Sequence, residues 1–185
     1  MKFQTHKFKI TGILPLLTHN PAGMKPATKG PGLKKIPSAE DEAKGGLYEN
    51  DKGQFCVPSV AFRSALLNGL KFKKIGKKSA ISVFQAFVLP VDEFTVLVDP
   101  ETRKPLKDYV IDTRRAVIQR SGILRSRPKF PIWGCDLQLS IDEDGTEPEM
   151  VAENLNIAGS IIGVGDFRVE KKGMFGTFTA ELADE

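Results

Sequence analysis

The sequence predicts a single α+β domain with an antiparallel sheet, two helices and long insertions. The chain has 185 residues, 41% of them hydrophobic and 27% charged, which is typical of one globular domain. Apolar and polar residues alternate near both ends of the chain, and this alternation is typical of strands. Two other segments repeat apolar residues every three or four positions, as helices do.

The first half of the chain predicts a strand and then a helix. In residues 3–14 the spacing of Phe3, Phe8 and Ile10 favours a strand, with a glycine near its end. Residues 55–72 indicate a short strand followed by a helix, for which Ser59 is the predicted N-cap. The apolar face of this helix would consist of Val60, Phe62, Ala65, Leu66 and Leu70.

The second half predicts strands around a second helix. Residues 81–99 read as β-structure interrupted at Pro90, and residues 132–145 alternate as a strand that ends in a turn. Thr146 and Glu149 have the spacing of a capping box. The following helix presents Val151, Leu155, Ala158 and Ile162, and "TFTAEL" predicts the last strand.

This order of elements is the βαββαβ plan of a ferredoxin-like, RRM-like domain spanning residues 1–185. Insertions are predicted at about 16–54 and about 73–131. The first is rich in proline and glycine, and residues 38–44 within it are expected to form a short capped helix.

The net charge of +4 conceals a strong asymmetry along the chain. Residues 1–80 contain 15 Lys and Arg against 5 Asp and Glu, whereas residues 132–185 contain 3 against 12. This asymmetry has three interpretations: a surface that binds a polyanion, a head-to-tail contact between copies, or solvated charge without a partner.

The cysteine content and the hydropathy of the sequence argue against a cysteine-bound metal site and against a membrane-spanning protein. Cys56 and Cys135 are the only cysteines and form no CxxC motif, so we expect two reduced, buried thiols, no metal site and no cofactor. No apolar run approaches the roughly 20 residues of a membrane-spanning helix, and the N-terminus lacks a signal-peptide core. The expected location is the cytoplasm, without a membrane partner.

The segment "GVGDFRVEKKGMFG", residues 163–176, combines closely spaced glycines with basic side chains. Glycine permits positive φ and close approach, so several N–H groups could point at one anion. The predicted phosphate-binding residues here are Gly163, Gly165, Arg168, Lys171, Lys172, Gly173 and Gly176. The alternative is a glycine-rich turn with solvated lysines.

Residues 114–129 form the strongest electrostatic signal, because they contain six cations and no acidic residue. Neutralising phosphates with such a segment would make binding strongly dependent on salt. Phe130 and Trp133 follow it and could stack on bases or pack in the core. The six predicted phosphate contacts are Arg114, Arg115, Arg120, Arg125, Arg127 and Lys129.

Two stretches resemble the RAMP superfamily, the RNA-binding subunits of CRISPR effector complexes. Residues 163–176 resemble its C-terminal glycine-rich loop, although "GMFG" is one residue longer than the family pattern. "VPSVAFRSALLNGL", residues 57–70, resembles the strand and helix start that lie against the nucleic acid in the family. The resemblance implies contacts from Ser59 and Arg63. It also implies a thumb-like insertion at residues 16–54, with Lys25, Lys34 and Lys35 facing phosphates; a disordered linker is the alternative.

The resemblance implies a non-catalytic subunit that binds single-stranded RNA, expected to be a guide RNA, with single-stranded DNA as the alternative. Copies would assemble head to tail as the backbone of a CRISPR-type ribonucleoprotein in antiviral defence, together with other effector subunits. A second hypothesis is a small metal-independent RNA endonuclease that uses His19, the weak catalytic candidate. A third is a structural or virion protein that binds no nucleic acid.

Overall fold

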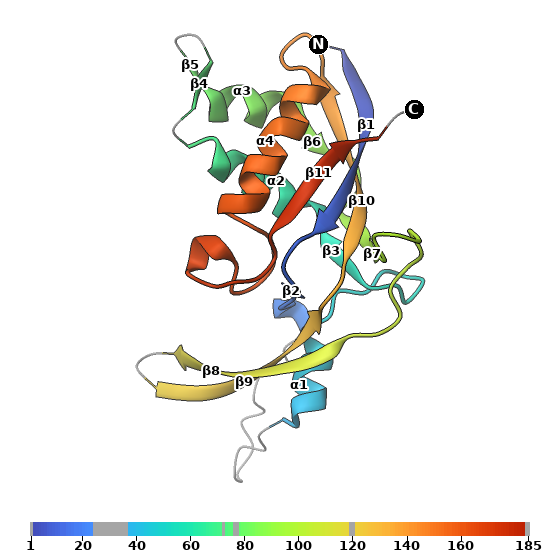
Figure 1. Cartoon of the computed structure of the whole chain (residues 1–185), viewed down its shortest axis with the longest axis vertical. Coiled ribbons are helices and arrows are strands. Elements are labelled where there is room, and N and C mark those ends of the chain that lie inside the picture. Colours follow the sequence, from blue (N-terminus) through green and yellow to red (C-terminus); the bar gives the residue numbers. More distant parts are fainter. Residues whose placement is uncertain (1, 24–36, 72, 76–77, 119–120, 184–185) are drawn as a thin grey trace.

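The computed structural model describes residues 2–23, 37–71, 73–75, 78–118 and 121–183. Its main sheet has the order β11-β1-β10-β7-β3, and β6 also pairs with β10 (Figure 1). Every pairing in this sheet is antiparallel. The strands are β1 (Phe3–Gly12), β3 (Cys56–Pro58), β6 (Val88–Pro90), β7 (Phe94–Val98), β10 (Gly134–Asp142) and β11 (Phe178–Leu182). The predicted α+β class is therefore confirmed.

Two helices cover one face of this sheet. Helix α2 (Ser59–Gly69) precedes β6 and β7 in the chain, and α4 (Pro148–Ile161) connects β10 to β11. In Figure 1 both helices lie on the same side of the sheet, and α4 runs alongside β11. Strand β10 lies between β1 and β7, and β1 lies between β10 and β11.

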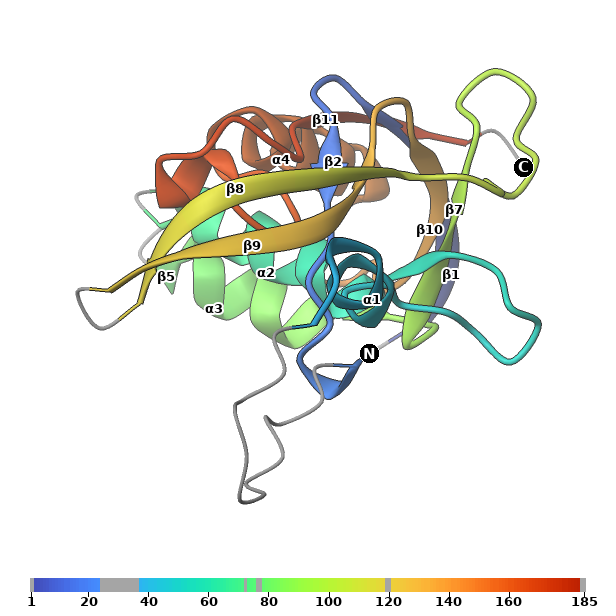
Figure 2. The same cartoon turned by 90° about the horizontal axis from the view of Figure 1, so that it is seen from below.

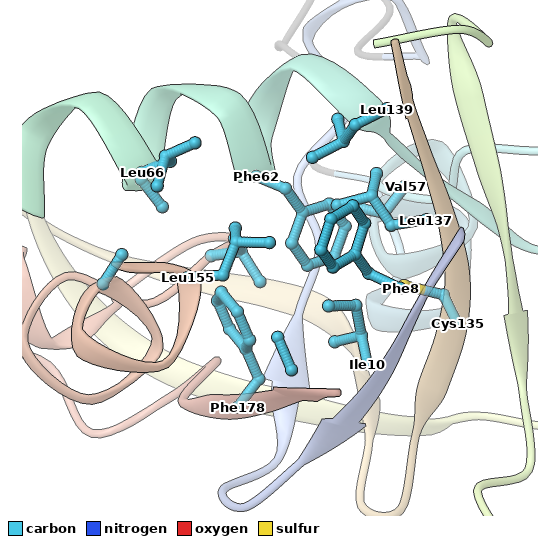
Figure 3. Packing of buried hydrophobic residues seen from close by; sticks show 14 of the residues in the cluster. Phe8, Ile10, Val57, Phe62, Leu66, Cys135, Leu137, Leu139, Leu155 and Phe178 are labelled. Atoms are coloured by element: carbon cyan, nitrogen blue, oxygen red, sulfur yellow. The ribbon is translucent and has the colours of Figure 1, made fainter. Parts of the chain in front are cut away.

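The hydrophobic core fills the space between these helices and the sheet (Figure 3). Phe8 and Leu137 contribute to it from the sheet and Phe62 from α2, and all three are fully buried. The rings of Phe62 and Phe178 meet edge to face, with their centroids 5.4 Å apart. Burial of this apolar surface is the main favourable contribution to folding.

Trp133 belongs to this core. Its side chain is fully buried, and its indole Nε1 donates a hydrogen bond to the carbonyl oxygen of Leu14 at 2.9 Å. A methyl group at Gly12 would overlap the indole ring, so the ring lies directly against the end of β1. Of the two roles that the sequence suggested, core packing is the one that the structure shows.

The N-terminal caps of the two main helices differ from the sequence prediction. The N-cap of α2 is Pro58, and the buried hydroxyl of Ser59 lies 2.7 Å from that of Thr95. The N-cap of α4 is Glu147, without a side-chain cap. Thr146 Oγ1 instead points to the sulfur of Met150, so the predicted capping box is wrong. The short helix predicted at 38–44 is confirmed as α1 (Ala39–Gly45), capped by Ser38.

A third helix occupies a segment for which the sequence predicted β-structure. Helix α3 (Ala80–Phe87) is followed directly by β6. Ala80 and Phe84 are fully buried at a spacing of four, so they share one face of the helix. The β-branched and aromatic residues of this segment also suit a strand, so its composition favoured the wrong structure. The short strands β4 (Lys74–Ile75) and β5 (Lys78–Ser79) precede the helix.

A second sheet is built around a long hairpin that projects away from the main sheet. Its order is β2-β9-β8, with β2 (Leu16–Leu17), β8 (Val110–Ile118) and β9 (Ser121–Phe130). Figure 1 shows this β8–β9 hairpin below the helical layer, and Figure 2, seen from below, shows it in front of the helices with α1 beside it. Ser126 N–H donates to the carboxylate of Glu42 in α1 at 2.9 Å. The range predicted as the second insertion thus contains this hairpin but also β6 and β7 of the main sheet.

Both cysteines are free and buried, as the sequence predicts. Burial raises the pKa of Cys56 to about 11, with a smaller contribution from Glu49, and burial also raises the pKa of Cys135. Because the thiolate is the nucleophile, we expect neither thiol to react with a disulfide reagent at pH 8 until the protein is unfolded. Thiol titration with and without denaturant measures this, and stoichiometric labelling of the native protein would contradict it.

Within the described residues, no helix is both long enough and apolar enough to cross a membrane.

Candidate nucleic-acid interface

A cleft of about 270 Å³ lies beside α2 and brings together four parts of the chain that are separate in the sequence. Helix α2 and the residue before it contribute Pro58, Ala61, Ser64, Ala65 and Asn68. Residues 162–166 and Arg168 form the opposite side, and Thr18, His19, Tyr48 and Val57 complete the lining. The two stretches that resemble the RAMP pattern therefore share one cleft with His19.

The glycine-rich loop, residues 163–176, follows α4 and contains the 3₁₀ helix η2 (Val169–Lys171). Gly163, Gly165 and Gly176 have φ values of 73°, 80° and 70°. The sequence predicted that glycine N–H groups of this loop would face an anion. In the structure three of them donate to carbonyl oxygens within the chain: Gly163 to Ala158, Gly173 to Arg168 and Gly176 to Pro15.

No described acceptor takes a hydrogen bond from the N–H of Gly165, which lines the cleft, so this N–H and the side chains are the parts of the glycine-rich loop that are open to a ligand. Lys171 and Lys172 are exposed, and no other described residue pairs with either ammonium group. Arg168 lines the cleft, where its guanidinium contacts Glu170 at 2.6 Å and the carbonyl oxygen of Gly165 at 3.3 Å. One cation of the loop, Arg168, thus lines the cleft, and two more, Lys171 and Lys172, are exposed elsewhere on the same loop.

The predicted residues at the start of α2 do not line the cleft. Arg63 donates from Nε to the carbonyl oxygen of Val88 at 2.9 Å and from Nη2 to that of Gln85 at 2.8 Å. It therefore ties α2 to the end of α3 and the start of β6. Ser59 is buried against Thr95, so its hydroxyl is closed to a ligand in this structure.

One face of the β8–β9 hairpin is basic. In the strand register Arg114 lies opposite Arg125, and Arg127 lies opposite Asp112. Because side chains alternate between the two faces of a hairpin, Arg114, Arg125, Arg127 and Lys129 share one face. Arg115 belongs to the other face and is exposed.

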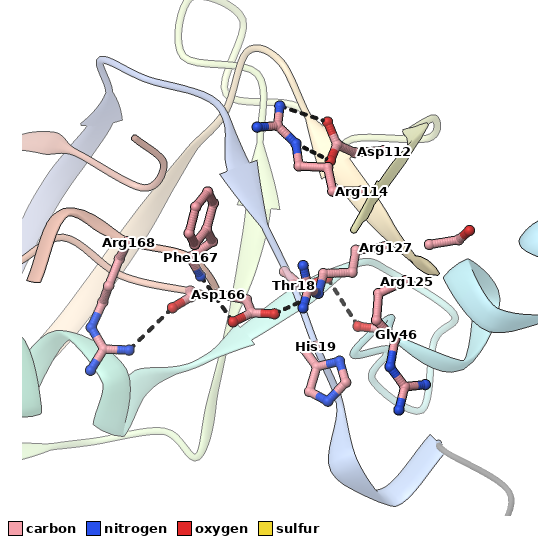
Figure 4. Close-up of polar contacts among 12 residues, drawn as sticks. Thr18, His19, Gly46, Asp112, Arg114, Arg125, Arg127, Asp166, Phe167 and Arg168 are labelled. Carbon is pink, nitrogen blue, oxygen red and sulfur yellow. Dashed lines mark hydrogen bonds and ion pairs between the residues drawn. The ribbon is translucent and has the colours of Figure 1, made fainter. Parts of the chain in front are cut away.

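The basic face of the hairpin contacts the glycine-rich loop at two points. Arg127 Nε lies 2.7 Å from the carboxylate of Asp166, which lines the cleft (Figure 4). The guanidinium of Arg114 lies over the ring of Phe175, 4.7 Å from its centroid. The hairpin therefore forms a basic border for the cleft.

Acidic side chains neutralise part of this charge. Arg114 pairs with Asp112 at 2.6 Å and Lys129 with the same carboxylate at 3.6 Å, while Arg125 pairs with Glu42 at 2.7 Å. Burial alone would raise the pKa of Asp112, but hydrogen bonding and attraction from Arg114 and Lys129 lower it on balance. Asp112 therefore remains ionised at neutral pH and offsets part of the positive charge.

His19 lies at the cleft, next to Thr18 (Figure 4). Its carbonyl oxygen accepts a hydrogen bond from the hydroxyl of Tyr48 at 3.1 Å, and no other described residue hydrogen-bonds to its imidazole. Across the described part of the chain, no three Asp, Glu, His or Cys side chains form a group that could hold a metal ion. The predicted contacts Lys25, Lys34, Lys35 and Arg120 lie outside the described residues.

Sequence reasoning missed Ser64, Asn68 and Asp166 as parts of this site. The signal for the first two was a pair of polar residues four positions apart within the apolar pattern of α2. Asp166 had no comparable signal, because its partner Arg127 belongs to a distant hairpin.

Comparison with known proteins does not assign the chain to a family. No family model matches it, and no curated protein matches it.

Proposed function

We propose that the protein binds single-stranded nucleic acid, RNA in preference to DNA, as a RAMP-type subunit of a CRISPR-type ribonucleoprotein. The observation that carries the proposal is the convergence of three segments on one cleft. Helix α2 and the glycine-rich loop line it, and the basic face of the β8–β9 hairpin contacts one of the lining residues, Asp166, through Arg127. Two of these segments were singled out by their resemblance to RAMP motifs, and the third by its arginine content.

The topology supports a ferredoxin-like domain. In that plan two βαβ units interleave, so that a strand of one unit lies between the two strands of the other. Here β10 lies between β1 and β7, and β1 lies between β10 and β11. Helices α2 and α4 would then be the two helices of the plan, and the hairpin and α1 would be additions to it.

The electrostatics of the border favour a phosphate backbone as the ligand. Arg168 lines the cleft, Arg127 contacts the lining residue Asp166, and the exposed Lys171 and Lys172 belong to the same loop as Arg168, so several phosphates of one strand could find a cation here. Arginine binds phosphate with two parallel hydrogen bonds, and a phosphate can replace the carboxylate that holds it in the free protein. Copies of the chain would follow the strand head to tail, because the basic and acidic parts of the sequence are complementary.

Purification at low salt tests the proposal. We expect a high 260/280 nm absorbance ratio and particles larger than a monomer that collapse after treatment with RNase but not with DNase. Collapse with DNase alone would identify DNA as the ligand. A clean monomer that also fails to bind added single strands would contradict the proposal and favour a structural protein without nucleic acid.

Removing the two loop lysines should weaken binding through charge alone. Lys171 and Lys172 are exposed, so the double change to alanine leaves the fold intact. For single strands the slope of log affinity against log salt is about 0.7 per phosphate neutralised, so we expect its magnitude to fall by about 1.4. Fluorescence anisotropy over a salt series measures the slope. An unchanged slope would remove these lysines from the interface.

The position of His19 in the cleft supports a second candidate, a metal-independent RNA endonuclease. A histidine beside a bound strand could act as a general acid or base. This candidate predicts that the purified protein shortens a hairpin RNA in the presence of a chelator and that His19→Ala stops the cleavage. An intact RNA after incubation with wild-type protein would contradict it.

A further inference from the structure

The cleft has an apolar wall, and two polar side chains of α2 that line it have no partner among the described residues. Val57, Ala61 and Ala65 contribute apolar surface from one side, and Ile162 and Val164 from the other. Ser64 and Asn68 also line the cleft, and no described residue hydrogen-bonds to the side chain of either. Two hydroxyls of the lining are engaged: that of Thr18 donates to Gly46 at 3.0 Å and that of Tyr48 to the carbonyl oxygen of His19 at 3.1 Å. The imidazole of His19, like Ser64 and Asn68, has no described hydrogen-bond partner.

The size of the cleft suits a small planar group. Its volume of about 270 Å³ is near the lower end of the roughly 300–1,000 Å³ typical of pockets for small molecules. The side chains of His19 and Tyr48 also line it and offer rings on which a base can stack. Phosphates need cations, which are supplied by Arg168 on the glycine-rich loop and by the hairpin at the border, whereas the apolar wall beside α2 offers nothing to a phosphate and favours a base.

We infer, on the basis of the proposed binding of a single strand, that the cleft accepts one unstacked base of that strand and that Asn68 reads its edge. An asparagine amide presents a donor and an acceptor side by side, and adenine is the base to which asparagine typically forms two hydrogen bonds, at N6 and N7. Ser64 is four residues earlier on the same helix and supplies a second polar contact. The cleft therefore gives an otherwise sequence-independent interface a preference for adenine at one position in each copy.

Binding of labelled oligo(A), oligo(C) and oligo(U) of equal length, at one salt concentration, tests this inference. We expect wild-type protein to bind oligo(A) at least about fivefold more tightly than oligo(U). Asn68→Ala should reduce this ratio to near one and change the affinity for oligo(U) by less than about twofold. The bases of each strand stack on one another to the same extent whichever protein is titrated. Comparing the ratio of oligo(A) to oligo(U) affinity between variants therefore removes the contribution of this stacking.

Two further variants separate reading of the base from a general disturbance of the helix. Asn68→Asp keeps the size of the side chain but removes its donor, so it should also lose the preference for adenine. Gln138→Ala removes an exposed amide from β10, outside the residues that line the cleft, and should keep the wild-type ratio. Circular dichroism confirms that each variant is folded.

The outcomes distinguish failure of the inference from failure of the proposed function. If wild-type protein binds all strands and Asn68→Ala keeps the wild-type ratio, the base-reading role is overturned while strand binding stands. If no strand binds, the proposed function fails, and titration with adenosine monophosphate then decides the inference. If wild-type protein binds adenosine monophosphate and Asn68→Ala abolishes this binding, the base site stands, with a free nucleotide as its ligand. If wild-type protein does not bind the nucleotide, the base site is overturned as well.

Discussion

We expect Gly176→Ala to lower the free energy of unfolding by about 2–5 kcal/mol. Gly176 has a φ of 70°, a left-handed conformation that costs a residue with a Cβ roughly 1–2 kcal/mol. A Cβ at this position would also overlap the carbonyl oxygen of Val164, a backbone atom that cannot rotate away. Overpacking of this kind typically adds about 1–3 kcal/mol.

The overlap would also break a defined set of hydrogen bonds. Val164 N–H donates to the carbonyl oxygen of Gly176 at 2.9 Å, and Gly176 N–H donates to that of Pro15 at 2.8 Å. These bonds join the two ends of the glycine-rich loop and fasten it to the chain after β1. The variant should therefore also lose affinity for single strands, because the border of the cleft shifts.

Gly53→Ala is the matched control for this change. Gly53 has the same φ of 70°, but a Cβ there would meet nothing within 4 Å. It should cost only the conformational contribution of about 1–2 kcal/mol and leave binding unchanged. Urea unfolding of both variants measures the difference. Equal losses of stability would show that contact with Val164 adds nothing and that the loop relaxes around the new methyl group.

The main sheet and its two covering helices could be predicted because their signals are local. Phe8 and Ile10 alternate with exposed residues along β1, and Val151 and Leu155 repeat with the helical period along α4. The helix α3 was missed for the opposite reason, since its apolar residues fit both periods over a short span. The capping box failed because the N-cap is Glu147, one residue after the threonine of the motif.

The candidate site could be predicted as a set of cations but not as an arrangement. The sequence identifies Arg63, Arg114 and Arg127 equally, as basic residues near recognisable motifs. In the structure Arg63 binds carbonyl oxygens of α3 and β6, whereas Arg127 contacts Asp166, which lines the cleft. The difference depends on where a distant hairpin and helix meet the loop, which is a long-range property that no local pattern encodes.

We expect Asp166→Asn to increase affinity for single-stranded RNA by about tenfold. The carboxylate of Asp166 lines the cleft and contacts Arg127 at 2.7 Å, so it both repels an incoming phosphate and occupies the cation that would bind it. Asparagine has the same size and keeps the Oδ1 that accepts from Phe167 N–H at 2.9 Å. The change therefore removes charge without removing the turn. A hydrogen bond from the released guanidinium of Arg127 to a charged phosphate is worth about 1.5–3 kcal/mol.

Arg127→Ala should have the opposite effect and weaken binding by about tenfold or more, because it removes the hydrogen bond between the guanidinium and a phosphate. Arg115→Ala is its control, since Arg115 is an exposed arginine on the other face of the same hairpin. Arg115→Ala should lower the affinity for single-stranded RNA by less than about threefold, because only a long-range charge interaction is lost.

The double variant decides whether Asp166 acts through Arg127. If the carboxylate competes with phosphate for this guanidinium, Asp166→Asn will gain much less affinity in the Arg127→Ala background than in wild type, because no arginine is left to release. If the gain is the same in both backgrounds, Asp166 acts on the strand directly through its own charge. Anisotropy titrations of the four proteins at one salt concentration give the coupling. A coupling of zero would show that phosphate does not replace the carboxylate at Arg127.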